Sequence, residues 1–265
     1  MAMKESRPLR PSAIYRLPPT VFCLLLAAIC FLPAGADGQT VTGAVTGAVT
    51  VNGRVVLVAA PRSKKGPDDS NAVVWLTPLG AASEPAPGAV RRRFRLIQKN
   101  KQFDPHVLVV PVGAMVDFPN LDPFFHNVFS LYDGKRFDLG LYEAGTTHTV
   151  TFDRPGVSYL FCNIHPQMSA IVVALRTPYY GVSNHAGEVT IRNVPPGRYR
   201  LEIWDERALP ATLKAASREV AIAANAASFE TVSLAESASP ATHHKNKYGR
   251  DYENLNAADP VYQQR

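Results

Sequence analysis

The sequence has few cysteines and little charge. Of its 265 residues only three are Cys and 19% are charged, against 46% hydrophobic residues. Two of the three, Cys23 and Cys30, lie within the first 36 residues, which leaves Cys162 as the one thiol beyond them. A chain that has lost those 36 residues can form no internal disulfide, so a hydrophobic core must hold it together. The composition excludes a disordered polymer and predicts a soluble globular protein.

Long hydrophobic runs are also scarce. Only residues 20–36 are apolar enough to enter a bilayer; they follow four basic residues and end in Ala-Gly-Ala. This pattern predicts a secretory signal peptide over residues 1–36 and a periplasmic or secreted protein with no membrane span after cleavage. An uncleaved anchor is the alternative, disfavoured because a span needs about 20 residues. Removing the leader lowers the net charge from +6 to +3, so nucleic acid is not an expected partner.

Short apolar runs bounded by Pro, Gly, Asn or Asp make up most of the rest, and helical periodicity is weak outside the Ala-rich residues 208–227. This spacing predicts an all-β protein made of sandwiches or barrels. After residue 178 an alternating strand, a Pro195-Pro196-Gly197 turn and a second strand predict a hairpin over residues 187–204. The strands before it are expected at residues 41–50, 53–60, 72–76, 94–98, 107–110, 115–118, 127–131, 146–152, 157–162 and 170–175.

Cys162 lies in a segment that concentrates metal ligands. Cys162, His165 and Met168 have the spacing C-x2-H-x2-M between two predicted strands, and His126 precedes another strand. Two imidazoles, one thiolate and a weak thioether form the ligand set of a blue-copper electron-transfer site. Structural zinc is the rival, disfavoured because it prefers four Cys and His ligands. Lone cysteines are more often inert core residues. A bound metal is the second, more specific explanation for this thiol.

Residues 93–176 resemble the type 1 copper cupredoxins, and most closely amicyanin, in the spacing of this loop. The resemblance runs through the Val112–Asn120 strand, His126-Asn127-Val128 and the Cys162 loop. It implies a Greek-key β-sandwich with copper held by His126, Cys162, His165 and Met168. It also implies an imidazole edge of His165 emerging through an apolar surface, which the sequence supplies with Pro123, Phe124, Phe125, Ile164 and Pro166.

The flanking segments predict a second domain. Residues 187–204 resemble the closing hairpin of carboxypeptidase-regulatory-like, or transthyretin-like, sandwiches, and the strands at residues 55–79 resemble the opening of that fold. We therefore expect one discontinuous sandwich over residues 40–90 and 177–236, interrupted by a copper domain over residues 91–176. Two consecutive sandwiches, or one enlarged sandwich, are the alternatives. The polar residues 237–265 predict a disordered tail.

The expected function is one-electron transfer between a donor and an acceptor protein, with copper alternating between Cu(II) and Cu(I). No His-x-His pair of a multicopper oxidase, second cysteine of a dinuclear centre, phosphate loop or G-x-S-x-G motif is present, so no enzyme activity is expected. The alternative is a copper-handling or accessory protein whose flanking sandwich binds a glycan or partner.

Other candidate residues have ordinary interpretations. His106, His148 and His185 are expected to be structural or surface residues. His243-His244 lack a rigid frame for a metal, and the basic residues 91–95 and Lys135-Arg136 are more typical of a solvated linker and surface than of a docking site.

Overall fold

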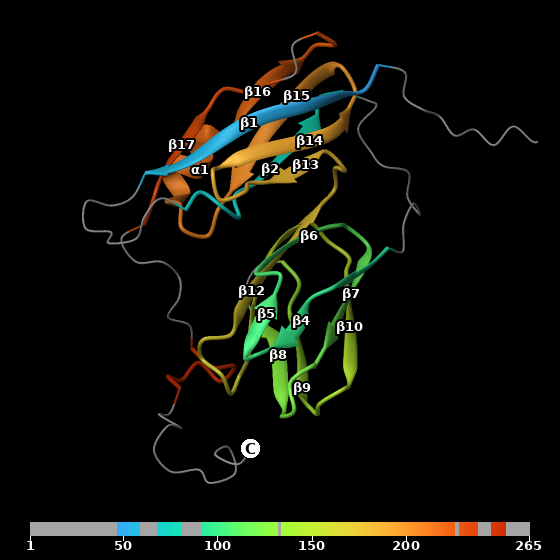
Figure 1. Cartoon of the computed structure of the whole chain (residues 1–265), viewed down its shortest axis with the longest axis vertical. Helices are drawn as coiled ribbons and strands as arrows, with labels where there is room; N and C mark the ends of the chain where they lie inside the picture. The colour runs from blue at the N-terminus through green and yellow to red at the C-terminus, as the bar shows by residue number, and fades with distance from the viewer. Residues whose placement is uncertain are drawn as a thin grey trace, which may run out of the picture. The chain divides into compact units, whose positions relative to one another are not determined.

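The computed structural model describes residues 47–58, 68–80, 92–131, 134–225, 228–237 and 245–252. These residues form β-strands and one short helix, which confirms the all-β prediction (Figure 1). The predicted leader over residues 1–36, the start of the first predicted strand, and His243-His244 lie outside the described residues. Within the described ranges, no helix is both long and apolar enough to cross a membrane.

Strands β3 to β12 form what we call the inner sandwich. Its core contains Phe118, Phe152 and Leu160, all fully buried. A small ladder of β4 (Ile97–Lys99) and β5 (Gln102–Asp104) accompanies two larger sheets. In spatial order, the five-stranded sheet is β6 (Val107–Pro111), β12 (Ser169–Leu175), β11 (Gly156–Phe161), β8 (His126–Ser130) and β9 (Phe137–Tyr142), and the three-stranded sheet is β10 (Thr147–Phe152), β7 (Ala114–Pro119) and β3 (Arg93–Arg95).

The strands on either side of this segment in sequence form what we call the outer sandwich (Figure 1). Its first sheet has the order β14 (Glu188–Val194), β1 (Val49–Val58) and β17 (Val232–Ala235). Its second sheet has the order β13 (Tyr180–Val182), β2 (Val73–Pro78), β15 (Gly197–Trp204) and β16 (Arg218–Ile222). The early strands β1 and β2 lie between late strands in both sheets, so the two flanks of the chain share one core. Whether these strands fold as a separate domain stays a prediction.

Two predicted elements are wrong in this region. Residues 187–204 are not a hairpin, because β14 pairs with β1 while β15 pairs with β2 and β16. Pro195 and Pro196 have no backbone N–H to close a two-strand ladder, and the turn carries the chain from one sheet to the other. The helix predicted over residues 208–227 covers only α1 (Pro210–Ala216), because Arg218–Ile222 pairs with β15 as β16.

Strand β12 is buried on both faces. Its residues 170–175 are all buried, and Ile171 and Val173 belong to a third apolar cluster that includes Val73 of β2. Double burial explains why this strand is uninterruptedly apolar instead of alternating. Near this cluster, Nε2 of His106 lies 2.7 Å from a carboxylate oxygen of Glu206, and that hydrogen bond raises the pKa of His106. His106 therefore has a structural role, as expected.

We predict that residues 177–236 expressed alone do not fold, because they lack the central strands β1 and β2 of both outer sheets. Adding a peptide of residues 40–90 should restore a cooperative urea transition, followed by circular dichroism. Residues 91–176, which contain a complete core, are the control and should unfold cooperatively alone. Cooperative unfolding of residues 177–236 without the peptide would show that the sandwiches are consecutive.

Candidate metal centre

The predicted ligands converge because the strands that carry them are neighbours. His126 begins β8, and Cys162 follows β11 directly. Strands β8 and β11 are antiparallel with Phe129 opposite Phe161, so the start of one lies beside the end of the other. His165 and Met168 occupy the loop between β11 and β12, which are adjacent in the same sheet.

Three donor atoms form a small triangle. Nδ1 of His126 lies 3.1 Å from Nδ1 of His165, and Sγ of Cys162 lies 3.8 Å and 3.6 Å from these two nitrogens. A point equidistant from the three atoms lies about 2.0 Å from each, close to the length of metal bonds to imidazole nitrogen and slightly below that to thiolate sulfur. Cys162 and His126 are fully buried and His165 is 8% exposed. The donor set and its spacing fit a single copper ion.

Both imidazoles are held in the neutral form that ligates metals. Burial lowers the pKa of His126 by more than its hydrogen bond to Asp122 raises it. Burial and the neighbouring His126 lower the pKa of His165 to about 4. Nε2 of His126 lies 2.8 Å from the Asp122 carboxylate and donates its proton there, which leaves the Nδ1 lone pair directed at the triangle.

The Cys162 thiol lies in an apolar environment. Burial raises its pKa, although the backbone N–H groups of Asn127, Ile164 and His165 act in the opposite direction. In the protein alone the proton therefore stays on sulfur at neutral pH. A bound cation would offset the cost of burying the thiolate, because a coordinating thiol is deprotonated by the metal.

Met168 closes the ligand loop. It is fully buried in the same cluster as Cys162, its N–H donates to the carbonyl of His165 at 3.0 Å, and its carbonyl accepts from the N–H of Cys162 at 3.2 Å. Together with Pro166, which restricts the backbone, these bonds fix the loop independently of a metal. The role of the Met168 thioether as fourth ligand stays a prediction.

Asp122 is a functional residue that the sequence analysis missed. Its buried carboxylate accepts hydrogen bonds from the backbone N–H of Asn100 at 2.6 Å and of Lys101 at 2.9 Å, as well as from His126. Burial alone would raise the pKa of Asp122, but these hydrogen bonds outweigh it and the pKa is lowered. The carboxylate is therefore ionised and fixes the orientation of His126. The position of Asp122 four residues before a candidate ligand histidine could have indicated this contact from the sequence.

The side-chain amides of Asn127 and Asn163, each of which follows a proposed ligand in sequence, do not link the two ligand loops to each other. The amide of Asn127 donates to Asp138 and to the carbonyl of Gly140, both at 2.8 Å. The amide oxygen of Asn163 accepts from the backbone N–H of Lys247 at 3.0 Å. Asn127 contacts the Cys162 sulfur through its backbone N–H and not through its side-chain amide. The strand pairing of β8 with β9 takes up the Asn127 side chain.

The other histidines are not part of the centre. Among the described residues, the one group of His, Cys, Asp and Glu spaced for a metal is His126, Cys162 and His165. The His148 ring packs against Tyr142 at a tilt of 41° with centroids 4.4 Å apart, and exposed His185 lies 3.0 Å from Asp68. Arg93, in the basic segment, pairs with Asp117 at 2.7 Å.

An apolar surface adjoins the centre. The Phe124 ring packs against His126 and His165, with centroids 5.2 Å and 5.7 Å apart. Next to it in sequence, Phe125 is 51% exposed, and Leu121 is 50% exposed. The ammonium group of Lys101 lies 5.4 Å from the centre of the Phe124 ring. An apolar face with a positive charge thus lies beside the ligand histidines.

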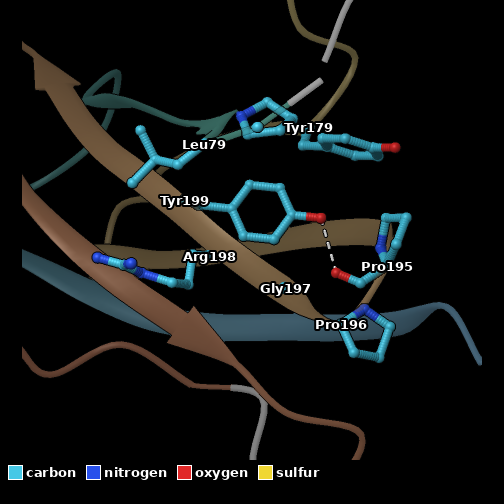
Figure 2. Close-up of a pocket in the computed structure, with 9 residues that line it drawn as sticks. Leu79, Tyr179, Pro195, Pro196, Gly197, Arg198 and Tyr199 are labelled. Atoms are coloured by element: carbon cyan, nitrogen blue, oxygen red, sulfur yellow. Dashed lines mark hydrogen bonds between the residues drawn. The ribbon is translucent and has the colours of Figure 1, made fainter. Parts of the chain in front are cut away.

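The outer sandwich has a separate hollow (Figure 2). Tyr179 and Tyr199 line it with their rings perpendicular, 5.9 Å apart, next to Pro195, Pro196 and Arg198. The Tyr199 hydroxyl donates to the carbonyl of Pro195 at 2.7 Å, and Arg198 pairs with Glu219 at 2.6 Å. Because these polar groups are already engaged within the fold, they are a poorer set for recognising a ligand than the triangle of donors.

Comparisons with known proteins give matches among solved structures only. No family model and no curated protein matches the chain. A purple cupredoxin from Nitrosopumilus maritimus is 24% identical over 31% of this chain and 99% of its own, with a TM-score of 0.29. A variant of amicyanin is 20% identical over 38% of this chain and 98% of its own, with a TM-score of 0.30. A copper-containing nitrite reductase from Thermus scotoductus SA-01 is 23% identical over 46% of this chain and 28% of its own, with a TM-score of 0.32.

We predict that Asp122→Asn lowers the affinity for Cu(II) about tenfold or more. The amide carries no charge to strengthen the His126 ligand, and its NH2 group would face a backbone N–H of Asn100 or Lys101 where a carboxylate oxygen now accepts. Competition with a chelator measures the affinity. Asp117→Asn, in the surface pair with Arg93, is the matched control and should leave it unchanged. Equal Cu(II) affinities in the two variants would show that Asp122 does not contribute to metal binding.

Proposed function

We propose that the protein is a type 1 copper protein that carries single electrons between two redox proteins outside the cytoplasm. The observation that carries the proposal is the buried triangle of His126 Nδ1, His165 Nδ1 and Cys162 Sγ. The Asp122 contact keeps the His126 proton on the opposite nitrogen, so the Nδ1 lone pair of His126 faces the other two donors. A metal ion that displaces the thiol proton can bind all three donors at once.

The ligand types favour copper over zinc. Thiolate and thioether stabilise Cu(I), while two imidazoles accommodate Cu(II). A copper ion held by His126, Cys162, His165 and Met168 would supply the reversible one-electron step. The chain contributes a rigid frame that excludes water and is built from the strand ends and the closed loop. This frame would change little in geometry between the two charge states of the site. Small rearrangement favours rapid electron exchange.

Partner exchange would use the surface beside the ligand histidines. Leu121 and Phe125 offer exposed apolar area, and the neighbouring Phe124 packs against both imidazoles. Lys101 adds a positive charge that suits a partner with an acidic rim. Small contacts of this kind release quickly, as a carrier that must visit a donor and then an acceptor requires.

Export and the absence of catalysis are further parts of the proposal. The leader-like residues 1–36 support a periplasmic or secreted location. In such an oxidising compartment a copper-bound Cys162 would be protected from pairing with another thiol. The described residues supply one metal-binding group, which suits a carrier better than a multicopper oxidase or reductase. Copper storage is the rival, and reversible voltammetry separates the two functions.

Loading the protein with Cu(II) should give a blue to green colour from thiolate-to-copper charge transfer, and Cys162→Ser should abolish it. A hydroxyl cannot replace the thiolate as donor. The visible spectrum measures this, and far-ultraviolet circular dichroism of the metal-free variant checks that the sandwiches are retained. A coloured Cys162→Ser protein would contradict the copper assignment.

Met168 is expected to tune the site rather than to hold the metal. Met168→Leu should retain copper and raise the reduction potential, because losing the weak thioether disfavours Cu(II) more than Cu(I). Voltammetry measures the shift, with Met115→Leu in β7 as the matched control. Loss of copper, or a lower potential, in Met168→Leu alone would refute the axial role.

A further inference from the structure

A short C-terminal segment lies against the ligand loop, although the tail from residue 237 was predicted to be disordered. The structure describes residues 245–252 of that tail. The Tyr252 hydroxyl donates to the carbonyl of Cys162 at 2.8 Å, and the backbone N–H of Lys247 donates to the Asn163 side chain at 3.0 Å. The segment therefore contacts a proposed ligand and the residue that follows it.

The segment has a conformation of its own. The side-chain oxygen of Asn246 accepts from the backbone N–H groups of Tyr248 and Arg250 at 3.0 Å and 3.1 Å. The backbone N–H of Asn246 donates to the carbonyl of Arg250 at 2.8 Å. Gly249 has φ of +74°, a conformation that a residue without a Cβ adopts readily. These bonds form a compact turn that holds Lys247 and Tyr252 in place. Polar composition alone predicted disorder because it does not reveal such a turn.

A third contact reaches the other ligand strand. The Lys247 ammonium group lies 2.8 Å from the Asp138 carboxylate of β9, and the other oxygen of that carboxylate accepts from Asn127 at 2.8 Å. Asn127 follows His126, and its backbone N–H faces the Cys162 sulfur. Residues 245–252 are thus connected to both chain segments that supply donors to the triangle.

We propose that residues 245–252 are an intramolecular strap that positions the Cys162 loop and keeps the reduction potential of the copper site high. The potential part rests on the proposed function, whereas the positioning part does not. The Tyr252 hydroxyl donates its proton to the backbone carbonyl of Cys162 itself. The positive end of this O–H dipole lies at the Cys162 carbonyl and withdraws electron density from that residue, which weakens its donation to Cu(II) more than to Cu(I), whereas the Lys247 charge is balanced by Asp138.

Covering the loop acts in the same direction. The oxidised site carries one more positive charge than the reduced site, and exclusion of water destabilises the more charged form. The hydrogen bond from Tyr252 and the exclusion of water by the strap both favour Cu(I). Removing the strap should consequently lower the potential and loosen the loop.

The first test uses the metal-free protein. A chain ending at Ser237 lacks the strap, and a chain ending at Tyr252 retains it while losing the same distal residues, which makes it the matched control. Reaction of Cys162 with a thiol reagent, followed on its own peptide by mass spectrometry, should be about tenfold faster in the shorter chain, because fewer hydrogen bonds oppose local opening of the loop. Equal labelling rates of Cys162 in the two chains would overturn the proposal that the strap positions the loop.

The second test uses the copper-loaded protein. Ending the chain at Ser237 should shift the electron-exchange equilibrium with a reference couple about tenfold toward the oxidised form, or about 59 mV for a one-electron couple. Tyr252→Phe should give about a threefold shift in the same direction, and Tyr248→Phe, whose side chain is 71% exposed, should give none. An unchanged or raised potential without the strap would overturn its tuning role.

The two tests separate this proposal from the proposed function. A protein that takes up no copper would refute the copper carrier, while the labelling of Cys162 would still decide whether the strap positions the loop. If the copper-loaded protein is blue, but neither its reduction potential nor the labelling rate of Cys162 changes when the strap is removed, the strap proposal is refuted. The proposed copper carrier would then still stand.

Discussion

The antiparallel pairing of β8 with β11 is the interaction on which the rest of the site depends. Only when Phe129 lies opposite Phe161 does His126 reach the loop that begins at Cys162. A slip of one residue would reverse every side chain of a strand between the two faces of the sheet. Because β8 is buried at all five positions, packing against both faces leaves no alternative register.

Burial then determines the chemistry of the donors. The same loss of water that lowers the pKa values of His126 and His165 raises that of Cys162. Two neutral imidazoles and a protonated thiol can share a dry site at neutral pH without any net charge. Among the residues that the structure describes, Asp122 is the one ionised side chain paired with a donor histidine, and backbone N–H groups compensate its charge. The site consequently favours binding of a soft cation and disfavours an uncompensated charge on any of the three donors.

The remaining parts of the chain support this frame from outside. The outer sandwich covers β12, the strand that follows Met168, through the cluster that contains Val73, Ile171 and Val173. The contacts of Lys247 and Tyr252 secure the other side of the ligand loop. Segments far from the centre in sequence therefore contact the strands and the loop that carry the donors.

The sequence by itself determined the all-β class, most strand positions and the four candidate ligands, because strand alternation and C-x2-H-x2-M spacing are local patterns. Alternation also identifies the inward face of β15, where Tyr199, Leu201 and Ile203 are buried. Strand β9 escaped notice because Gly140, at φ of +68°, interrupts its pattern. Only the tertiary structure decided which sheet β14 and β15 join, that Asp122 holds His126, and that residues 245–252 contact the ligand loop. Those are choices between partners distant in sequence, and local propensity carries no information about them.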